Sequence, residues 1–218
     1  MTLVNEGFTG YSSREGQSRV NTLSPQTFQN SRALFLAGNP ALDFLNTRMR
    51  MNHELVDFLQ SDRDVISWLK QAGFAVSADT EIKRFSLLQS ARKLRENIRS
   101  LVEKRKAGRQ GDPSVLNLYL AASQSYSQVV WSKSHSFRID IVRRQNTSES
   151  ILAPVAEATA ELLATANFEL VKRCEDKACV LWFSDQTKSH RRRWCSTQIC
   201  GNRHKVAAYR RRLRQQNT

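Results

Sequence analysis

Between residues 79 and 107, apolar side chains recur at every third or fourth position, and Lys or Arg occupies many of the positions between them. This spacing is typical of an α-helix with one buried face, because 3.6 residues complete each helical turn. The apolar positions are Ile82, Phe85, Leu88, Ala91, Leu94, Ile98 and Leu101. We therefore predict one long helix over residues 79–107, which the glycines at 108 and 111 bring to an end.

Four shorter segments combine helix-start residues with apolar residues at helical spacing. Ser61 and Asp64 are spaced as a capping box. Pro40 and Pro113 suit the first turns of two further helices, and Ser150 is placed to cap the last one. The predicted helices run from residue 41 to about 48, from 61 to 73, from 112 to about 126 and from 150 to about 166.

Residues 129–141 show the alternation of apolar and polar positions that strands favour. Val129 to Trp131 and Phe137 to Ile141 flank a polar turn, which predicts a β-hairpin. The fold class is thus mainly α, with a helical N-terminal domain over residues 31–167 that contains one small β-hairpin. Residues 1–30 are rich in Ser, Thr, Asn, Gln and Gly. Such a segment buries too little apolar surface to fold, so we predict a disordered tail.

All four cysteines lie in the last fifth of the chain, as Cys174-x4-Cys179 and Cys195-x4-Cys200. Two close pairs of thiolates suit a tetrahedral Zn²⁺, so the spacing predicts one structural zinc site without an open position for water. Two disulfides are the alternative, but they need an oxidising compartment, and no export signal is evident. In a third arrangement, His190 or His204 replaces one of the cysteines.

The net charge is +14, and the C-terminal part of the chain carries most of it. Residues 172–214 contain thirteen Lys or Arg against three acidic residues. So dense a positive charge on a small module favours a polyanionic partner, and DNA is our first expectation. An ordinary solvated charged face is the alternative.

The motifs RC-x4-C, WF-x-D, RRRWC and CGNR occur in this order from Arg173 to Arg203. Together they resemble the CGNR zinc finger, whose relatives carry an N-terminal ABATE domain described as a stress-induced transcription regulator. The stretch 42–47, LDFLNT, is similar to a signature near the start of that domain. The resemblance covers roughly residues 33–214. It implies a treble-clef-like finger over residues 168–218 that ends in a basic helix, and a regulatory function.

We select the candidate nucleic-acid contacts from the basic residues of the finger. They are Arg191, Arg192, Arg193, Arg203, Lys205, Arg210, Arg211 and Arg212. Arg203 is an equally good candidate for bracing the knuckles. Ile199, Val206 and Leu213 repeat every seven residues, so we expect one edge of the terminal helix to pack. Trp182, Phe183 and Trp194 are expected to form the core of the finger, with base stacking as the alternative.

Asp43, Asn46 and Thr47 are polar residues within a mostly apolar segment. They are candidates for a ligand pocket in a sensor domain. The interpretation that we favour is structural, since such side chains satisfy backbone groups at the ends of a buried helix.

The sequence thus predicts a cytoplasmic transcription regulator that binds DNA through a zinc-stabilised finger. The N-terminal domain would sense a signal, in the form of a small molecule or a protein partner. The alternative is a finger that binds protein or RNA. We expect no enzyme, because no catalytic constellation is evident, and no membrane partner, because no apolar run is long enough to span a bilayer.

Overall fold

The computed structural model describes residues 35–51, 54–76, 86–133 and 135–216, and the predicted tail lies outside this range. The helices are α1 (Pro40–Leu45), α2 (Asp62–Gln71), α3 (Ser86–Lys106), α4 (Ser114–Ala121), α5 (Ser148–Thr165), a short π-helix η2 (Thr197–Gly201) and α6 (Asn202–Gln216). The strands are β1 (Arg48–Met51), β2 (Glu54–Asp57), β3 (Ser125–Trp131), β4 (Phe137–Arg143), β5 (Val171–Arg173) and β6 (Trp182–Ser184). Consecutive strands pair into three antiparallel two-stranded sheets.

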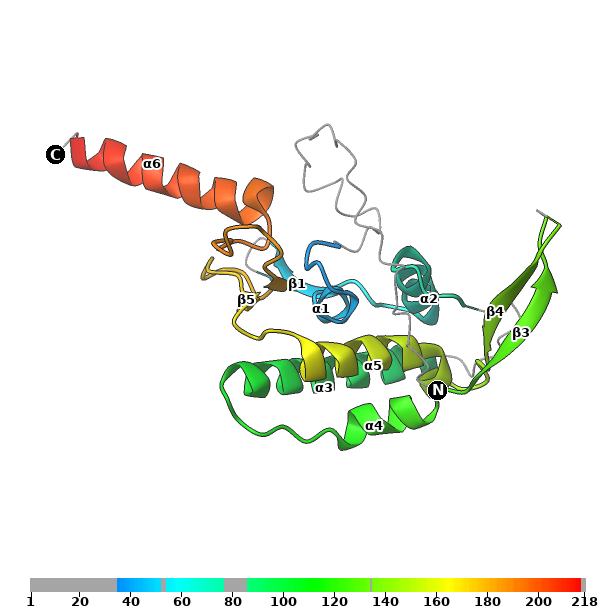
Figure 1. Ribbon diagram of the computed structural model, residues 1–218. Coiled ribbons are helices and arrows are strands. Elements are labelled where there is room, and N and C mark those ends of the chain that lie inside the picture. The colour runs from blue at the N-terminus through cyan, green and yellow to red at the C-terminus, as the bar shows by residue number, and fades with distance from the viewer. Residues whose placement is uncertain (1–34, 52–53, 77–85, 134, 217–218) are drawn as a thin grey trace.

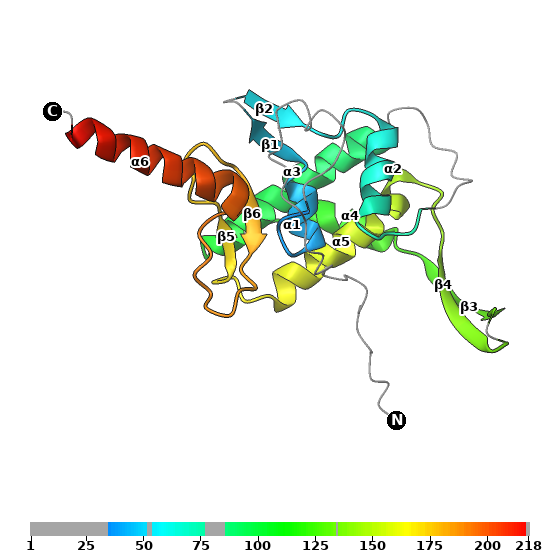
Figure 2. The ribbon, with the colours of Figure 1, turned by 90° about the horizontal axis from the view of Figure 1, so that it is seen from above.

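Helices α3 and α5 lie side by side at the centre of the N-terminal part (Figure 1). Helix α4 packs against both of them, and α1 contacts both as well. The β5–β6 pair lies at one end of this group beside α1, and the β3–β4 hairpin projects from the other end (Figure 2). None of the described helices combines the length and the apolar character needed to cross a membrane.

The predicted long helix is confirmed from Ser86 to Lys106, and its apolar face is buried. Ile82 and Phe85 lie outside the described residues. The capping box at the start of α2 is also confirmed, because the Ser61 hydroxyl accepts the Asp64 N–H and the Asp64 carboxylate accepts the Ser61 N–H.

Three predicted helix ends need correction. Helix α5 begins at Ser148, because Thr147 is the N-cap and Ser150 is its capping-box partner inside the first turn. Helix α1 ends at Leu45, and α4 ends at Ala121, because in both places the chain turns into a strand. The prediction of a single hairpin in this domain was wrong as well, since β1 and β2 form another.

The finger and the N-terminal domain share one hydrophobic core. Val171, Leu181 and Phe183 of the finger belong to the same buried cluster as the residues of α1, α3 and α5. The mainly α fold is confirmed. The treble-clef geometry of the finger and the domain boundary between residues 167 and 168 stay predictions.

Arg95 of α3 is buried and holds the end of the β1–β2 hairpin. Its Nη1 donates to Thr47 Oγ1 at 2.9 Å and to Asp57 Oδ1 at 2.7 Å, and its Nη2 donates to Asp57 Oδ2 at 2.5 Å. Burial by itself raises the pKa of Asp57, but hydrogen bonds from Arg95 and from the Leu59 N–H outweigh it and keep this pKa below its ordinary value. The pair therefore ties the hairpin to the helical core.

We expect Arg95→Met to lower the free energy of unfolding by about 2–4 kcal/mol, because it removes the buried guanidinium that hydrogen-bonds Asp57 and leaves that carboxylate only the longer ion pair with Arg92. Urea unfolding followed by circular dichroism measures this. Arg48→Met is the matched control, since Arg48 pairs with Glu96 at the surface and should matter by less than about 1 kcal/mol. Equal losses in the two variants would contradict the role of the buried pair.

The same pair has a pH signature. Because the pKa of Asp57 is lowered in the folded chain, the pair contributes fully above the unfolded value of about 3.9, and the contribution is lost as the pH falls through the folded value. The stability difference between wild type and Arg95→Met should be constant from about pH 7 to 5 and shrink below about pH 4. A difference that persists to about pH 2 would contradict this.

Candidate functional site

Four cysteine side chains from different elements converge at one end of the molecule. Cys174 and Cys179 lie in the turn between β5 and β6, Cys195 lies in the following loop, and Cys200 lies in η2. Their Sγ atoms all lie within 4.8 Å of one another. The Sγ–Sγ distance is 3.8 Å from Cys179 to Cys195 and 3.6 Å from Cys195 to Cys200.

This cluster fits a zinc ion. A tetrahedron with Zn–S distances of about 2.3 Å has S–S edges of about 3.8 Å, close to the distances found. All four thiols are buried, and four thiolates leave no coordination position for water. The site therefore holds one structural Zn²⁺, as predicted.

The two histidines near the cysteines have other contacts. The His204 ring lies against Trp194, with 4.6 Å between the ring centroids, and His190 Nδ1 lies 3.3 Å from the Asp185 carbonyl. Within the described residues, the metal-binding cluster consists of cysteines alone. Replacement of a cysteine by either histidine is therefore not supported.

Asp185 of the WF-x-D motif organises the loop between the two cysteine pairs. Its fully buried carboxylate accepts hydrogen bonds from Lys172 Nζ at 2.7 Å, from Thr187 Oγ1 at 2.6 Å and from the Arg192 N–H at 2.9 Å. Burial raises the pKa of Asp185, but these bonds outweigh it and hold the pKa far below its ordinary value. The carboxylate thus stays charged and fixes the path of the chain toward Cys195.

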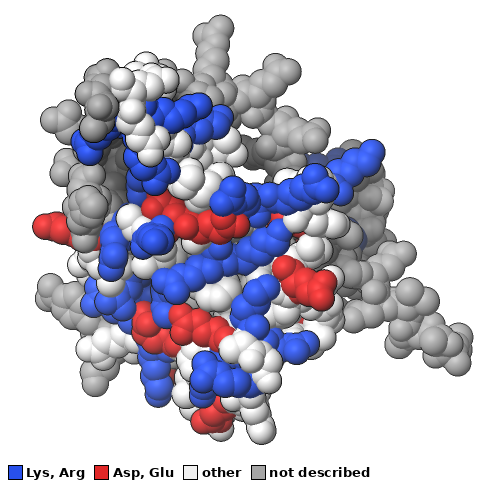
Figure 3. Space-filling view, turned by 90° about the vertical axis from the view of Figure 1, so that its left-hand side faces the viewer, with Lys and Arg blue, Asp and Glu red and all other residues white. Residues whose placement is uncertain are grey.

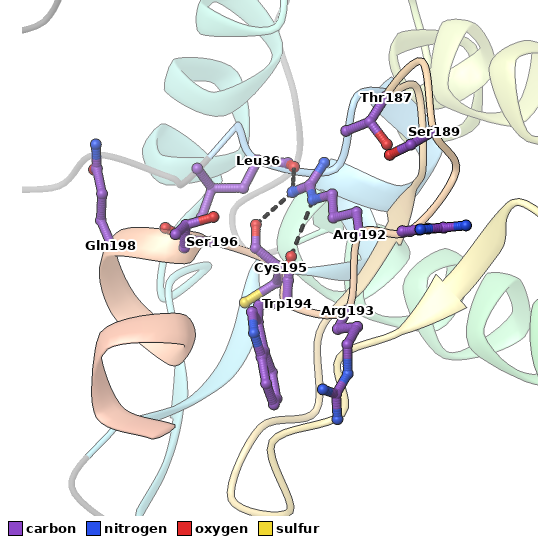
Figure 4. A pocket seen from close by; sticks show the side chains of 11 residues that line it. Leu36, Thr187, Ser189, Arg192, Arg193, Trp194, Cys195, Ser196 and Gln198 are labelled. Carbon is purple, nitrogen blue, oxygen red and sulfur yellow. Dashed lines mark hydrogen bonds between the residues drawn. The ribbon is translucent and has the colours of Figure 1, made fainter. Parts of the chain in front are cut away.

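Arg192 proves to be a structural residue. Its guanidinium donates to the carbonyl oxygens of Leu36, Trp194 and Cys195 (Figure 4), and it lies 4.3 Å from the centroid of the Phe183 ring. A guanidinium with these partners is not available to a phosphate. We therefore withdraw Arg192 from the candidate nucleic-acid contacts.

Arg191 and Arg193, which flank Arg192, remain at the surface. They line an open hollow of about 670 Å³ together with Ser196, Thr197 and Gln198 at the start of η2. Arg193 Nε also donates to Glu175 at 2.6 Å, and its guanidinium lies over the Trp194 ring. The hollow combines cationic side chains with hydroxyl and amide groups, which suits a bound phosphate.

Helix α6 buries none of its residues and projects away from the rest of the molecule (Figure 1). The predicted packed edge is therefore wrong for Val206 and Leu213, which are exposed, whereas Ile199 in η2 is partly buried against the core. Val206, Tyr209 and Leu213 form an apolar stripe along α6. Trp182 and Phe183 are buried, which confirms them as the core of the finger, and Trp194 is half-buried.

The basic residues of α6 flank this apolar stripe on both sides. At 100° per residue, Arg203, Arg210 and Arg214 lie on one side, and Lys205 and Arg212 lie on the other. Residues 186–218 contain ten Lys or Arg and no Asp or Glu. Figure 3 views the molecule from the side toward which α6 points, and Lys and Arg outnumber Asp and Glu there.

Arg203 has a partner within the finger. Its Nη1 donates to Asp176 Oδ2 at 3.1 Å, so the CGNR motif is joined to the turn that carries the first cysteine pair. Gly201 is buried, and a Cβ at this position would lie 3.3 Å from Trp194, so the close packing leaves little room for a side chain. Arg203 thus braces the zinc knuckles, and Gly201 allows them to pack closely.

The candidate pocket residues face protein groups. Asp43 Oδ1 accepts the Ala37 N–H at 2.8 Å, and Thr47 Oγ1 donates to the Phe44 carbonyl at 2.7 Å while it accepts from Arg95. Asn46 reaches the finger: its Nδ2 donates to the Trp182 carbonyl at 2.7 Å, and its Oδ1 accepts the Trp182 N–H at 3.0 Å. These contacts support the structural interpretation, in which the three side chains join α1 to its surroundings.

The contact between the α1 region and the finger, which we call the joint, also includes hydrogen bonds that sequence reasoning missed. The Ser184 N–H donates to the Ala37 carbonyl at 2.7 Å, and Gln186 Nε2 donates to the Gly38 carbonyl at 2.7 Å. The motifs LDFLNT and WF-x-D lie on the two sides of this joint, but their spacing does not indicate that they meet.

We expect Asn46→Ala to lower the free energy of unfolding by about 2–4 kcal/mol, because it removes the hydrogen-bond partner of both the N–H and the carbonyl of buried Trp182. The zinc content per chain should stay at one, since no ligand is touched. Asn117→Ala, an exposed site in α4, is the control and should have little effect. Unchanged stability of Asn46→Ala would show that the joint is not needed.

Comparison with known families agrees with this geometry. A family model described as "Putative stress-induced transcription regulator", the ABATE family, matches residues 38–166, and the CGNR zinc finger model matches residues 171–213. A comparison with curated proteins found no match. The chain belongs to the ABATE family and carries a CGNR zinc finger at its C-terminal end.

Proposed function

We propose that this protein regulates transcription by binding DNA through α6 and the adjoining loop of the zinc finger. The observation that carries the proposal is the character of α6, a helix without a buried residue that carries basic residues on both sides of an apolar stripe. The ABATE family description supports the regulatory part of the proposal.

The dimensions of α6 suit the major groove of DNA. Its 15 residues span about 22 Å, and the groove is about 12 Å wide, enough for one α-helix. With the stripe of Val206, Tyr209 and Leu213 toward the bases, the two basic rows reach the phosphate backbones on either side. Apolar side chains in this position contact thymine methyl groups.

The hollow beside η2 supplies a further phosphate contact. Arg191 and Arg193 lie on its wall, close to the zinc site, at the end of the finger from which α6 departs. A backbone phosphate held there would fix the register of α6 on the duplex.

The ABATE domain would have the sensing role in this proposal. A small molecule or a protein bound to it would act on the finger through α1, because Asn46 joins α1 directly to β6. The proposed DNA binding agrees with the cytoplasmic location that the sequence analysis expects.

A second candidate function is an interaction module for protein or RNA. The basic residues of α6 surround the apolar stripe instead of gathering on one face, and this arrangement also suits an apolar groove with acidic rims in a partner protein. The experiment below separates the two candidates.

The test measures binding of the zinc-loaded chain to random duplex DNA over a salt series. The triple variant Lys205→Gln, Arg210→Gln, Arg212→Gln should reduce the slope of the log binding constant against log salt concentration by about 2–3 units, because each lost phosphate contact removes about 0.9. Arg192→Gln should instead lower stability, with a far smaller change in slope.

The control triple is Arg63→Gln, Lys70→Gln, Arg109→Gln, which removes the same charge from exposed sites of the ABATE domain. The proposal requires that this variant keep the wild-type slope. Equal reductions in the two triples would point to net charge alone. No binding at low salt with full zinc occupancy would refute DNA binding and favour the second candidate.

A further inference from the structure

The β3–β4 hairpin exposes a continuous apolar face. Val129 pairs with Ile139 and Trp131 pairs with Phe137, so these four side chains share one face with Ile141, which lies opposite Ser127. The exposed fractions are 63% for Val129, 61% for Trp131, 72% for Phe137, 71% for Ile139 and 68% for Ile141. Large apolar side chains are thus concentrated on a surface that no other described element covers.

The opposite face of the hairpin is mixed, because Tyr126, Val130 and Val142 lie on it beside polar residues. It carries Gln128 and an ion pair between Arg138 and Asp140, with 3.0 Å between the charged atoms. The face with the five large apolar side chains is thus the more exposed of the two, since Val130 and Val142 on the other face are partly buried.

The hairpin is held firmly in this position. At its base, Arg143 forms two hydrogen bonds with Glu157 of α5, of 2.7 and 2.8 Å, and the Arg144 N–H donates to the Gln124 carbonyl at 2.9 Å. At its tip, the Trp131 and Phe137 rings meet edge to face, with 4.7 Å between their centroids. A two-stranded sheet is marginal in water without packing on one face, so the arrangement calls for a partner.

We propose that this face is the contact through which two copies of the chain form a two-fold symmetric dimer. An isologous contact requires a surface that is complementary to itself, and a flat, uncharged apolar face meets this condition. Two chains of net charge +14 repel each other, so a contact between them must avoid the basic surfaces. The five apolar side chains carry no charge, and Arg143 at the base of the same face is neutralised by Glu157.

The proposed dimer is compatible with the proposed DNA binding but does not depend on it. The hairpin and α6 project from opposite ends of the molecule in both ribbon views (Figures 1 and 2). A dimer formed through the hairpins leaves both copies of α6 uncovered.

The size of the face predicts how strong the dimer is. Seven residues per strand and two strands give a face about 24 Å long and about 10 Å wide. Closing two such faces on each other would bury on the order of 1,000 Å² in total, the low end for specific interfaces. The dimer should therefore dissociate on dilution.

Sedimentation velocity of the zinc-loaded full chain, from about 1 μM to 1 mM, tests the proposal. The wild type should shift from monomer to dimer within this range. Ile139→Lys places a charge at the centre of the face and should raise the dissociation constant at least about tenfold. Gln128→Lys adds the same charge to the opposite face of the same hairpin and should dimerise like the wild type.

Amide hydrogen exchange in residues 125–143 shows whether the hairpin survives in each variant. It also shows whether protection rises with concentration in the wild type, as dimerisation through this face requires. A wild type that stays monomeric over the whole range would overturn the proposal, and so would equal dimerisation of the two lysine variants. Binding of the monomeric chain to lipid vesicles through this hairpin would also overturn it, since the face would then have another occupant.

Discussion

The C-terminal part of this protein depends on bringing four cysteine sulfurs within 4.8 Å of one another. Two three-residue strands and a short π-helix bury too little apolar surface to hold that arrangement by themselves. The zinc ion supplies the missing free energy, because it binds the folded arrangement of thiolates and not the unfolded chain. Buried Asp185 and Arg192 then fix the loop between the two cysteine pairs.

The metal is only one of two anchors of the finger, and α1 of the ABATE domain is the other. The Asn46 amide pairs with both backbone groups of Trp182, as a neighbouring strand would. Arg192 reaches the Leu36 carbonyl from the opposite direction, and Asp43 holds Ala37 in place. Thr47 continues the chain of contacts to Arg95. Hydrogen bonds thus connect Arg95, α1 and the finger in one continuous set of contacts.

Local patterns predicted much of this structure. The periodicity of α3, the Ser61 capping box and the cysteine spacing each involve residues close in sequence, so elementary geometry sufficed. The pairing of Asn46 with Trp182 could not be predicted in this way, because it joins positions 136 residues apart. Arg192 looked like its neighbours in the basic run, and only the fold shows that carbonyl oxygens surround it. The β1–β2 strands are too short to show a clear alternation.

The heptad spacing in α6 predicted an edge, but not whether that edge would be covered. Val206 and Leu213 lie on one side of the helix as expected, yet the helix leaves the body before they can pack. The same holds for the β3–β4 hairpin. Its alternation of apolar and polar residues predicted the strands correctly but left open which face is exposed. In both places the sequence pattern is that of a buried surface, and the described part of the chain does not bury it.

The most direct test of the coupling between zinc and the ABATE domain is amide hydrogen exchange before and after removal of the metal by a chelator. If the zinc site holds the finger against α1, chelation should raise exchange in β5, β6 and η2, and also in α1, while α3 and α5 keep their protection. If exchange in α1 stays unchanged while the finger unfolds, the two parts are independent, and the joint at Asn46 does not transmit the state of the metal site.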